Sequence, residues 1–595
     1  MRLLDPSRHL FEVELRIADP APSQCVRMPS WIPGSYLLRE FARHIVSIRG
    51  ESGGRAVDAE QVAKGAWLFR GAAEELVVTI EVHALDPSIR GAYFTRERAY
   101  FNGTSLFLQP DGRDDPVELE LDAPHDEGCE GWRVATAMEP AAVDGRGFGR
   151  YRAASYDELI DHPFEIGQFE RVDFVAGGVP HRLVVSGRFD TDLDRVAADL
   201  ARLCTAQIEF FGGAPFDRYW FLGHAVGDGY GGLEHCASSS LLFDRDDLPK
   251  PGEPGVPADY QRFLSLASHE YFHAWHVKRT KPAAFLPYRL DRRNHTRLLW
   301  VFEGITSYYQ DLFVLRSGLI GRDVYLKRLG QALTRAYRTP GRFRQTLADA
   351  SFNAWDVLYK PEPNAQNTSV NYYVQGALVA LALDLELRRR SSSSLDDVVR
   401  ELWRRYGAVG IGVPEDGFER LAEEVAGIEL GEFFERAIRS TEELPLGDAL
   451  AAFGIELGLR PQLGAEDRGG MPAPRDAAPS LTLGAAYRLR AEGVELTAVL
   501  DGGPAQRAGL VPGAVLIALD RLKVNERNLR RRLARCETGQ HVTAAVFRGD
   551  RLLEIGIVLA EAPADTCWLH VAADADPAAV ARRDAWLGKK TVQQP

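Results

Sequence analysis

The sequence has few cysteines, no long apolar run and no excess of basic residues. Its 595 residues include only six cysteines, and none of them forms a C-x-x-C pair. Sparse, unpaired cysteines argue against a disulfide scaffold, a zinc ribbon and a redox dithiol. No stretch approaches 18 uncharged apolar residues, so we expect no transmembrane helix. Residues 1–17 also lack the apolar core of a signal peptide, so we expect a cytoplasmic protein without a membrane partner.

The charge balance is mildly acidic. The chain carries 71 Lys and Arg against 84 Asp and Glu, a net charge of −13. Such a chain has no general attraction for nucleic acid or anionic membranes, so we expect neither as a partner. The local exception is the basic run 527–535 (RNLRRRLAR), which we interpret as a solvated helix face. A composition of 45% hydrophobic and 26% charged residues is typical of soluble globular proteins.

The length predicts three or four domains, at roughly 150 residues each. Residues 1–166 alternate apolar and polar positions, as in 10–17 (LFEVELRI), and predict an N-terminal β-sandwich domain. Residues 167–455 contain one early strand and then mainly helical periodicity. This periodicity predicts helices at Leu193–Phe211, Asp259–Arg279, Thr296–Ser317, Val370–Arg389, Leu395–Tyr406 and Leu430–Ser440.

The C-terminal third changes character again. Residues 456–563 begin with a Pro- and Gly-rich loop or linker, 461–480, after which short strands return around one helix, 526–536. The tail, 564–595, is expected to hold a short helix at most. The fold class is therefore multidomain α+β, with no internal repeats.

The strongest chemical signal is the pentapeptide at 269–273 (HEYFH). On a helix, His269 and His273 lie four residues apart on one face and can reach one Zn²⁺. Zinc lowers the pKa of a bound water from about 15.7 to roughly 7, and Glu270 can act as the general base. The alternative is a chance match on a solvated helix.

A catalytic zinc needs three protein ligands and an open position. Glu303 is the best third ligand, because it lies in an otherwise apolar and aromatic run, 300–309 (WVFEGITSYY). A buried carboxylate there requires a partner. The alternative is that Glu303 pairs with Arg297. A competing third ligand, His276, lies on the same predicted helix; we interpret it as lying behind the ligands or in the core.

These residues resemble the glycyl aminopeptidase family of zinc metallopeptidases, relatives of aminopeptidase N with a thermolysin-like catalytic domain. The resemblance covers most of the chain. It rests on five segments: 28–45 (MPSWIPGSYLLREFARHI), 231–235 (GGLEH), 269–279 (HEYFHAWHVKR), 298–309 (LLWVFEGITSYY) and 372–376 (YYVQG).

The resemblance implies roles for individual residues. His269, His273 and Glu303 match the ligands of one zinc ion, and Glu270 matches the general base. Residues 231–235 are similar to the exopeptidase strand of aminopeptidase N relatives. Gly231, Gly232 and Glu234 would bind substrate there, with Glu234 on the free α-ammonium; the alternative for Glu234 is an ordinary loop carboxylate.

An oxyanion donor is also implied. Tyr373 matches the tyrosine that hydrogen-bonds the tetrahedral oxyanion, although the adjacent Tyr372 competes for that role and a core aromatic is the plain alternative. Three positions depart from the family pattern: Gln375 replaces an expected Lys, Ser307 an expected acid and His276 an expected Asn.

The C-terminal module resembles the PDZ domain of bacterial proteases. The similarity lies in 501–520 (DGGPAQRAGLVPGAVLIALD), and 481–485 (LTLGA) is the candidate carboxylate-binding loop. PDZ domains bind extended peptides by strand addition. A C-terminal peptide is therefore a candidate partner, and a purely structural module with a covered groove is the alternative.

We expect a zinc aminopeptidase that removes small N-terminal residues, Gly or Ala, from peptides with a free N-terminus. Two other functions remain: a zinc endopeptidase regulated by the PDZ module, and a non-catalytic PDZ adaptor on a peptidase scaffold. The complete set of ligand and base residues argues against the adaptor.

Overall fold

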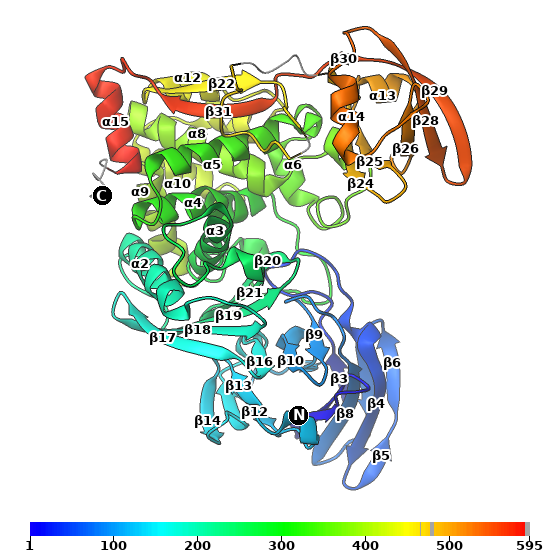
Figure 1. Cartoon of the computed structure of the whole chain (residues 1–595). Helices are drawn as coiled ribbons and strands as arrows, with labels where there is room; N and C mark the ends of the chain where they lie inside the picture. The colour runs from blue at the N-terminus through cyan, green and yellow to red at the C-terminus, as the bar shows by residue number, and fades with distance from the viewer. Residues whose placement is uncertain (465, 476–480, 589–595) are drawn as a thin grey trace. The chain divides into compact units, whose positions relative to one another are not determined.

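The computed structural model describes residues 1–464, 466–475 and 481–588 (Figure 1). Residues 465 and 476–480 of the predicted loop, and 589–595 of the predicted tail, lie outside the described residues. The chain divides into two compact units, the first of residues 1–295 and 400–414 and the second of residues 296–399 and 415–595. The helices that the structure describes include none long and apolar enough to cross a membrane.

The N-terminal part is β-rich, as the alternating pattern predicts. Buried Val and Ile side chains alternate with outward residues along β2 and β8, which pair antiparallel over their full length. Its described strands form four sheets. The five-stranded sheet has the order β1 (Arg2–Asp5), β2 (Leu10–Ala18), β8 (Glu75–His83), β4 (Ile45–Ser52), β5 (Arg55–Val57), and the three-stranded sheet has the order β12 (Val117–Leu121), β15 (Gly149–Ala153), β14 (Glu139–Val143). The two four-stranded sheets have the orders β13 (Arg133–Ala135), β16 (Phe164–Gly167), β10 (Arg98–Phe101), β9 (Ala92–Phe94) and β11 (Gln109–Pro110), β3 (Ser23–Arg27), β7 (Ala66–Arg70), β6 (Ala59–Ala63).

A mixed five-stranded sheet follows in the first unit. Its order is β17 (Glu170–Ala176), β18 (Val179–Gly187), β19 (Tyr219–Val226), β21 (Ser238–Asp244) and β20 (Tyr230–Glu234). The two central pairings are parallel and the outer ones antiparallel, which places β20 at an edge. The sequence predicted β18 and the 231–235 strand but not β17, β19 and β21.

Two helices pack with this sheet. Helix α2 (Leu193–Phe211) has the predicted bounds, with Asp192 accepting two backbone hydrogen bonds at its N-terminus and Gly212 in the left-handed region at its end. Helix α3 (Ala258–Phe272) contacts β20 and β21 and carries the 269–273 motif at its C-terminus.

Helix α3 ends seven residues earlier than predicted. Residues 273–280 turn back on themselves, with Lys278 N donating to His273 O (3.0 Å) and Thr280 N to Trp275 O (2.8 Å). Val277 has a φ of 145°, which no helix tolerates. His276 is therefore not on the helical face that carries His269 and His273, and that part of the prediction was wrong.

The second unit is mainly helical around α8, with π-helical stretches at η6 and η9. The π segment η6 interrupts the predicted helix Thr296–Ser317, which in the structure begins only at residue 299. Apart from η8, which belongs to the first unit, and α9, which crosses the boundary, the following elements lie here: η6 (Trp300–Gly304), α4 (Ile305–Arg316), α5 (Arg322–Tyr337), α6 (Leu347–Phe352), α7 (Ala365–Thr368), α8 (Tyr372–Arg390), α9 (Leu395–Leu402), η8 (Trp403–Gly407), α10 (Gly417–Ala426), α11 (Gly431–Phe434), η9 (Glu435–Arg439) and α12 (Leu446–Ala451).

The C-terminal β region has its own core of buried aliphatic residues, including Leu496, Leu516 and Val546. Its sheet runs β24 (Ala485–Leu489), β25 (Val494–Val499), β26 (Val515–Leu519), β28 (His541–Arg548), β29 (Arg551–Val558), with β27 (Leu522–Lys523) on β26 and helices α13 (Pro504–Arg507) and α14 (Glu526–Leu533). Strands β23 (Leu481–Thr482) and β30 (Ala560–Glu561) pair at its base.

The tail holds more than the short helix that the sequence predicted. Strand β31 (Thr566–Val571) pairs with β22 (Ile455–Arg460), and helix α15 (Pro577–Leu587) follows it. Trp586 of α15 is buried and donates its indole N–H to the Tyr308 hydroxyl at 2.8 Å. These contacts tie residues 566–587 to the helical part of the second unit.

Candidate active site

Strand β20 and the end of helix α3 bring together Glu234, Glu270 and His273. One ligand atom from each of these three side chains lies within 4.8 Å of the others, and all three are buried. Gly232, two residues before Glu234, faces the same side. A Cβ placed on Gly232 would lie only 1.9 Å from Oε1 of Glu270. The glycine therefore makes room for the Glu270 carboxylate.

The two histidines of the motif remain neighbours although the helix ends between them. Their rings lie edge to face with centroids 4.6 Å apart. His273 is 1% exposed, and its Nδ1 contacts the backbone carbonyl of His276 at 2.7 Å. Because a carbonyl only accepts, Nδ1 carries the hydrogen and Nε2 keeps its lone pair for a metal. Imidazoles beside buried carboxylates form a donor set that fits zinc.

The unpredicted turn at 273–280 thus has a local effect on the site. It places the carbonyl of His276 on His273, so His276 acts through its backbone and lies behind the predicted ligand. This agrees with the interpretation of His276 as lying behind the ligands, but for a reason the helical pattern did not contain.

Glu234 is the last residue of β20. Its side chain is 3% exposed, and its Oε1 has no hydrogen-bond partner among the described residues. Gly34 of the N-terminal part lies directly over it. Gly34 has a φ of 95°, and a Cβ there would lie 2.5 and 2.6 Å from the two carboxylate oxygens of Glu234. The loop needs glycine for both its backbone conformation and this close approach.

The N-terminal part also supports the edge strand. Arg90 donates to the carbonyl of Gly232 at 2.9 Å. The indole of Trp31 donates to the carbonyl of Arg289 at 2.9 Å and is fully buried, which anchors the loop that carries Gly34. The β-rich part is therefore a wall of the candidate site. No local sequence signal pointed to these contacts, which join residues more than 100 positions apart.

A buried charge cluster holds the segment after Glu234. Asp161 contacts the Lys278 ammonium at 2.5 Å and accepts the backbone N–H of Cys236 at 2.7 Å, with His235 Nδ1 3.6 Å away. Burial alone would raise the pKa of Asp161, yet Lys278 and His235 hold it well below its ordinary value. Asp161 therefore stays ionised and paired with Lys278 just after the end of β20.

Glu303 and Tyr373 belong to the second unit. Glu303 lies in η6 and is 2% exposed. Arg297, the alternative partner considered for it, instead pairs with Asp349 at 2.7 Å. Short π-helical stretches such as η6 are frequent at functional sites.

Two glycines bring η6 against the start of α8. A Cβ on Gly304 would lie 2.6 Å from Cα of Gly376, so the two backbones touch. Gly304 follows Glu303, and Gly376 lies one helical turn after Tyr373. Asn371 begins α8 by accepting the backbone N–H groups of Tyr373 and Val374. The crossing fixes Glu303 and the start of α8 relative to each other.

The two adjacent tyrosines differ in exposure. Tyr372 is buried, and burial, with Tyr359 and Glu303 nearby, raises its pKa well above 10. Tyr373 is half-buried and contacts the Tyr359 hydroxyl at 2.8 Å. A group that meets substrate must be accessible, so this difference favours Tyr373 over Tyr372.

Comparisons with known proteins agree on one family. The model of the peptidase M61 N-terminal domain matches residues 1–168, and that of M61 glycyl aminopeptidase matches residues 262–379. A solved structure of an aminopeptidase N family protein from Idiomarina loihiensis is 37% identical, with a TM-score of 0.94 over 98% of this chain and 99% of that chain. The chain belongs to the M61 glycyl aminopeptidase family. It is a metallopeptidase, and its substrates are peptides.

More distant likenesses also exist. An M1 zinc metallopeptidase from Deinococcus radiodurans is 14% identical to the peptidase, with a TM-score of 0.44 over 75% of this chain and 93% of that chain. Legionella pneumophila aminopeptidase A in complex with aspartic acid is also 14% identical, with a TM-score of 0.47 over 78% of this chain and 50% of that chain. A comparison with curated proteins finds no match.

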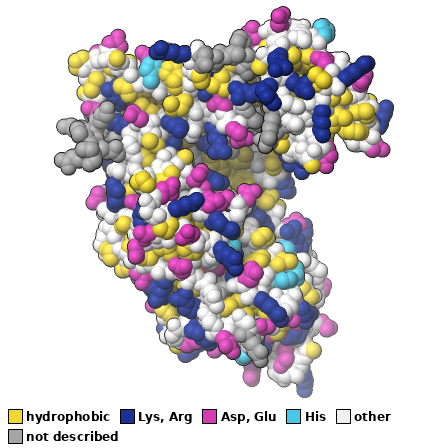
Figure 2. Space-filling model, viewed as in Figure 1, with side chains coloured by type: hydrophobic (Ala, Val, Ile, Leu, Met, Phe, Trp, Pro, Cys, Tyr) yellow, Lys and Arg dark blue, Asp and Glu magenta, His cyan; other side chains and the backbone are white. Residues whose placement is uncertain are grey.

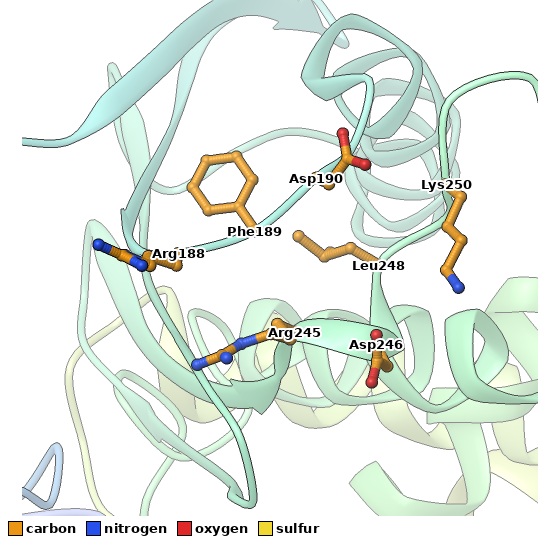
Figure 3. Close-up of a pocket in the computed structure, with 7 residues that line it drawn as sticks. All are labelled: Arg188, Phe189, Asp190, Arg245, Asp246, Leu248 and Lys250. Atoms are coloured by element: carbon orange, nitrogen blue, oxygen red, sulfur yellow. The ribbon is translucent and has the colours of Figure 1, made fainter.

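The visible face of the peptidase carries intermixed basic and acidic side chains (Figure 2). A small pocket of about 210 Å³ lies in the first unit between the end of β18 and η4 (Arg245–Asp247). Figure 3 shows Arg188 and Arg245 at one end of it and Lys250 at the other, with Asp190 and Asp246 also lining it. These charged side chains are exposed, and none belongs to the predicted catalytic set.

Proposed function

We propose that this peptidase is a zinc-dependent aminopeptidase. The observation that carries the proposal is Glu234. Oε1 of its buried carboxylate has no hydrogen-bond partner in the described part of the chain, and a carboxylate oxygen of Glu234 lies within 4.8 Å of ligand atoms of Glu270 and His273. A buried anion without such a partner is costly, and the α-ammonium of a substrate would complete it.

The proposed zinc site consists of His269, His273 and Glu303. The Nδ1 contact of His273 leaves its other nitrogen for the metal, and the burial of Glu303 supports its assignment as the third ligand. When bound, zinc would supply the Lewis acidity that activates a water and polarises the scissile carbonyl. Three protein ligands would leave the open position that such catalysis needs.

The remaining steps are assigned to the chain's own groups. Glu270 would take the proton of the attacking water and pass it to the leaving nitrogen. Tyr373 would donate a hydrogen bond to the developing oxyanion. Gly231 and Gly232 would leave room for the substrate backbone along β20, while Glu234 holds the free amine and so excludes blocked N-termini.

The proposed preference is for small N-terminal residues, Gly or Ala. It rests on the glycyl aminopeptidase family and on the cap over Glu234, where Gly34 approaches within van der Waals range. The proposed substrates are peptides with a free N-terminus.

The test of the metal site is zinc content. Chelation and reloading should give one zinc ion per chain. His273→Ala should lose both the metal and peptidase activity, because only two of the three proposed protein ligands remain. His125→Ala, at an exposed histidine in the N-terminal part, serves as the control and should keep both. Full zinc occupancy in His273→Ala would contradict the ligand assignment.

We also propose that the predicted region 456–563 is a PDZ domain, with its main sheet between residues 485 and 558, and that it binds peptide C-termini. Strand β24 is an edge strand of the described sheet, and a peptide that binds by strand addition pairs with an edge strand. The module also has its own hydrophobic core. The side-chain amide of Asn367 in α7 donates to the carbonyl of Val499 (2.8 Å) and accepts from the backbone N–H of Asp501 (3.0 Å). These two hydrogen bonds anchor the module within the second unit.

The PDZ proposal predicts selective binding of free carboxylates. In a titration of the full chain, a peptide with an apolar C-terminal residue should bind at least ~10-fold more tightly than its C-terminal amide, since charge-assisted hydrogen bonds are the strong ones. Equal binding of the two peptides would support a purely structural module instead.

A further inference from the structure

Three tyrosine hydroxyls meet at the start of α8. Tyr359, in the segment between α6 and α7, lies 2.8 Å from the Tyr373 hydroxyl and 3.3 Å from the Tyr372 hydroxyl. The rings of Tyr372 and Tyr373 are stacked with centroids 4.8 Å apart. Tyr359 is thus the point at which the hydroxyls of the two sequence neighbours are joined.

The number of hydrogens limits the direction of these hydrogen bonds during the reaction. Each hydroxyl has one hydrogen to donate. Tyr372 donates to Tyr359, whereas either oxygen can be the donor between Tyr359 and Tyr373. Once Tyr373 donates its hydrogen to an oxyanion, its oxygen can keep the hydrogen bond with Tyr359 only by accepting from it.

We propose that Tyr359 is a positioning residue for Tyr373 in peptide hydrolysis, the middle of a chain running from Tyr372 through Tyr359 to Tyr373. The inference rests on the proposed role of Tyr373. By donating to the Tyr373 oxygen, Tyr359 fixes the phenol and makes its hydrogen a better donor, because hydrogen bonds in a chain polarise one another. It acts only through Tyr373 and does not touch substrate.

The environment of the chain supports a fixed geometry. Tyr372 is buried, so its hydroxyl must find a partner within the protein, and Tyr359 supplies it. The start of α8 is fixed by the Asn371 cap and by the Gly304–Gly376 contact. Tyr359 itself lies on a segment without regular structure, and its hydroxyl contacts the hydroxyls of both tyrosines at this fixed helix start.

The test is a double-mutant cycle on kcat with an alanyl arylamide. Tyr373→Phe should lower kcat ~100-fold, the typical loss of an oxyanion donor. Tyr359→Phe should lower kcat ~10-fold with KM within about twofold, the loss of one hydrogen bond to the donor. In the Tyr373→Phe background, Tyr359→Phe should change kcat less than about twofold, because the group through which it acts is gone. The control Tyr337→Phe removes a hydroxyl at the end of α5, outside the three-tyrosine chain, and should leave kcat unchanged.

The outcomes separate this inference from the function on which it rests. Independent, multiplicative losses from Tyr359→Phe and Tyr373→Phe would overturn the inference, since a purely structural role persists in both backgrounds. A larger loss in Tyr359→Phe than in Tyr373→Phe would also overturn it. A Tyr373→Phe variant with wild-type kcat would instead overturn the proposed role of Tyr373 itself.

Discussion

Replacing Glu270 with Gln is expected to abolish turnover while zinc stays bound. The substitution preserves shape, so the amide should occupy the same space over Gly232, where the fit leaves no room even for a methyl group. It removes the only function that the account assigns to this side chain, the transfer of a proton from water to the leaving nitrogen. General bases contribute ~10²–10⁴-fold, so kcat should fall by at least two orders of magnitude.

The measurement is kcat for an alanyl arylamide together with zinc content and melting temperature. Glu51→Gln, at an exposed position in the N-terminal part, is the matched control and should leave all three unchanged. If Glu270→Gln kept more than about a tenth of wild-type kcat, far above the loss typical of a general base, the account of the mechanism would be wrong.

Replacing Glu234 with Gln is expected to weaken the hydrolysis of free-amine substrates. Losing one partner of a buried charge pair costs about 2–5 kcal/mol, and each 1.4 kcal/mol is tenfold, so kcat/KM should fall roughly 30-fold or more. The loss should be specific to the amine: weak cleavage of an N-acetylated substrate, if any is detected, should not change. A parallel loss for both substrates would show that Glu234 does not recognise the amine.

A second substitution tests the role of Glu234 by crowding its carboxylate with a new methyl group at residue 34. Gly34→Ala would place a Cβ within 2.6 Å of both carboxylate oxygens, so the carboxylate must move and the same selective loss should follow. Gly71→Ala is the matched control, because Gly71 also has a positive φ, 77°, but open space around its Cβ position. Equal effects of the two substitutions would trace the loss to backbone strain rather than to Glu234.

Much of the architecture could be predicted from local patterns. Helix α2 has the predicted bounds because its apolar spacing, the Asp192 cap and Gly212 all lie within the segment itself. The return of short strands around one helix after residue 480 was likewise expected, and the structure has these strands and α14 there. The end of α3 could not be predicted, because residues 273–279 contain no helix breaker and the turn there depends on bonds such as that from Lys278 N to His273 O.

The candidate site could likewise be predicted only in part from the sequence. The 269–273 motif and Glu234 were visible because their chemistry is concentrated in short segments. Gly34, Arg90 and Tyr359 were not, because each acts on a residue that is distant in the sequence or lies on another element. Strand β31 was missed for a related reason: its partner β22 precedes it by about a hundred residues, and six residues alone carry a weak signal.

The central claim is that this metallopeptidase removes N-terminal residues by gripping a free amine. The most direct measurement compares hydrolysis of glycyl and alanyl arylamides with that of their N-acetylated counterparts by the zinc-loaded protein. The account predicts cleavage of the free-amine substrates and none of the acetylated ones. Comparable cleavage of both would contradict it and favour an endopeptidase, and cleavage of neither would contradict it as well.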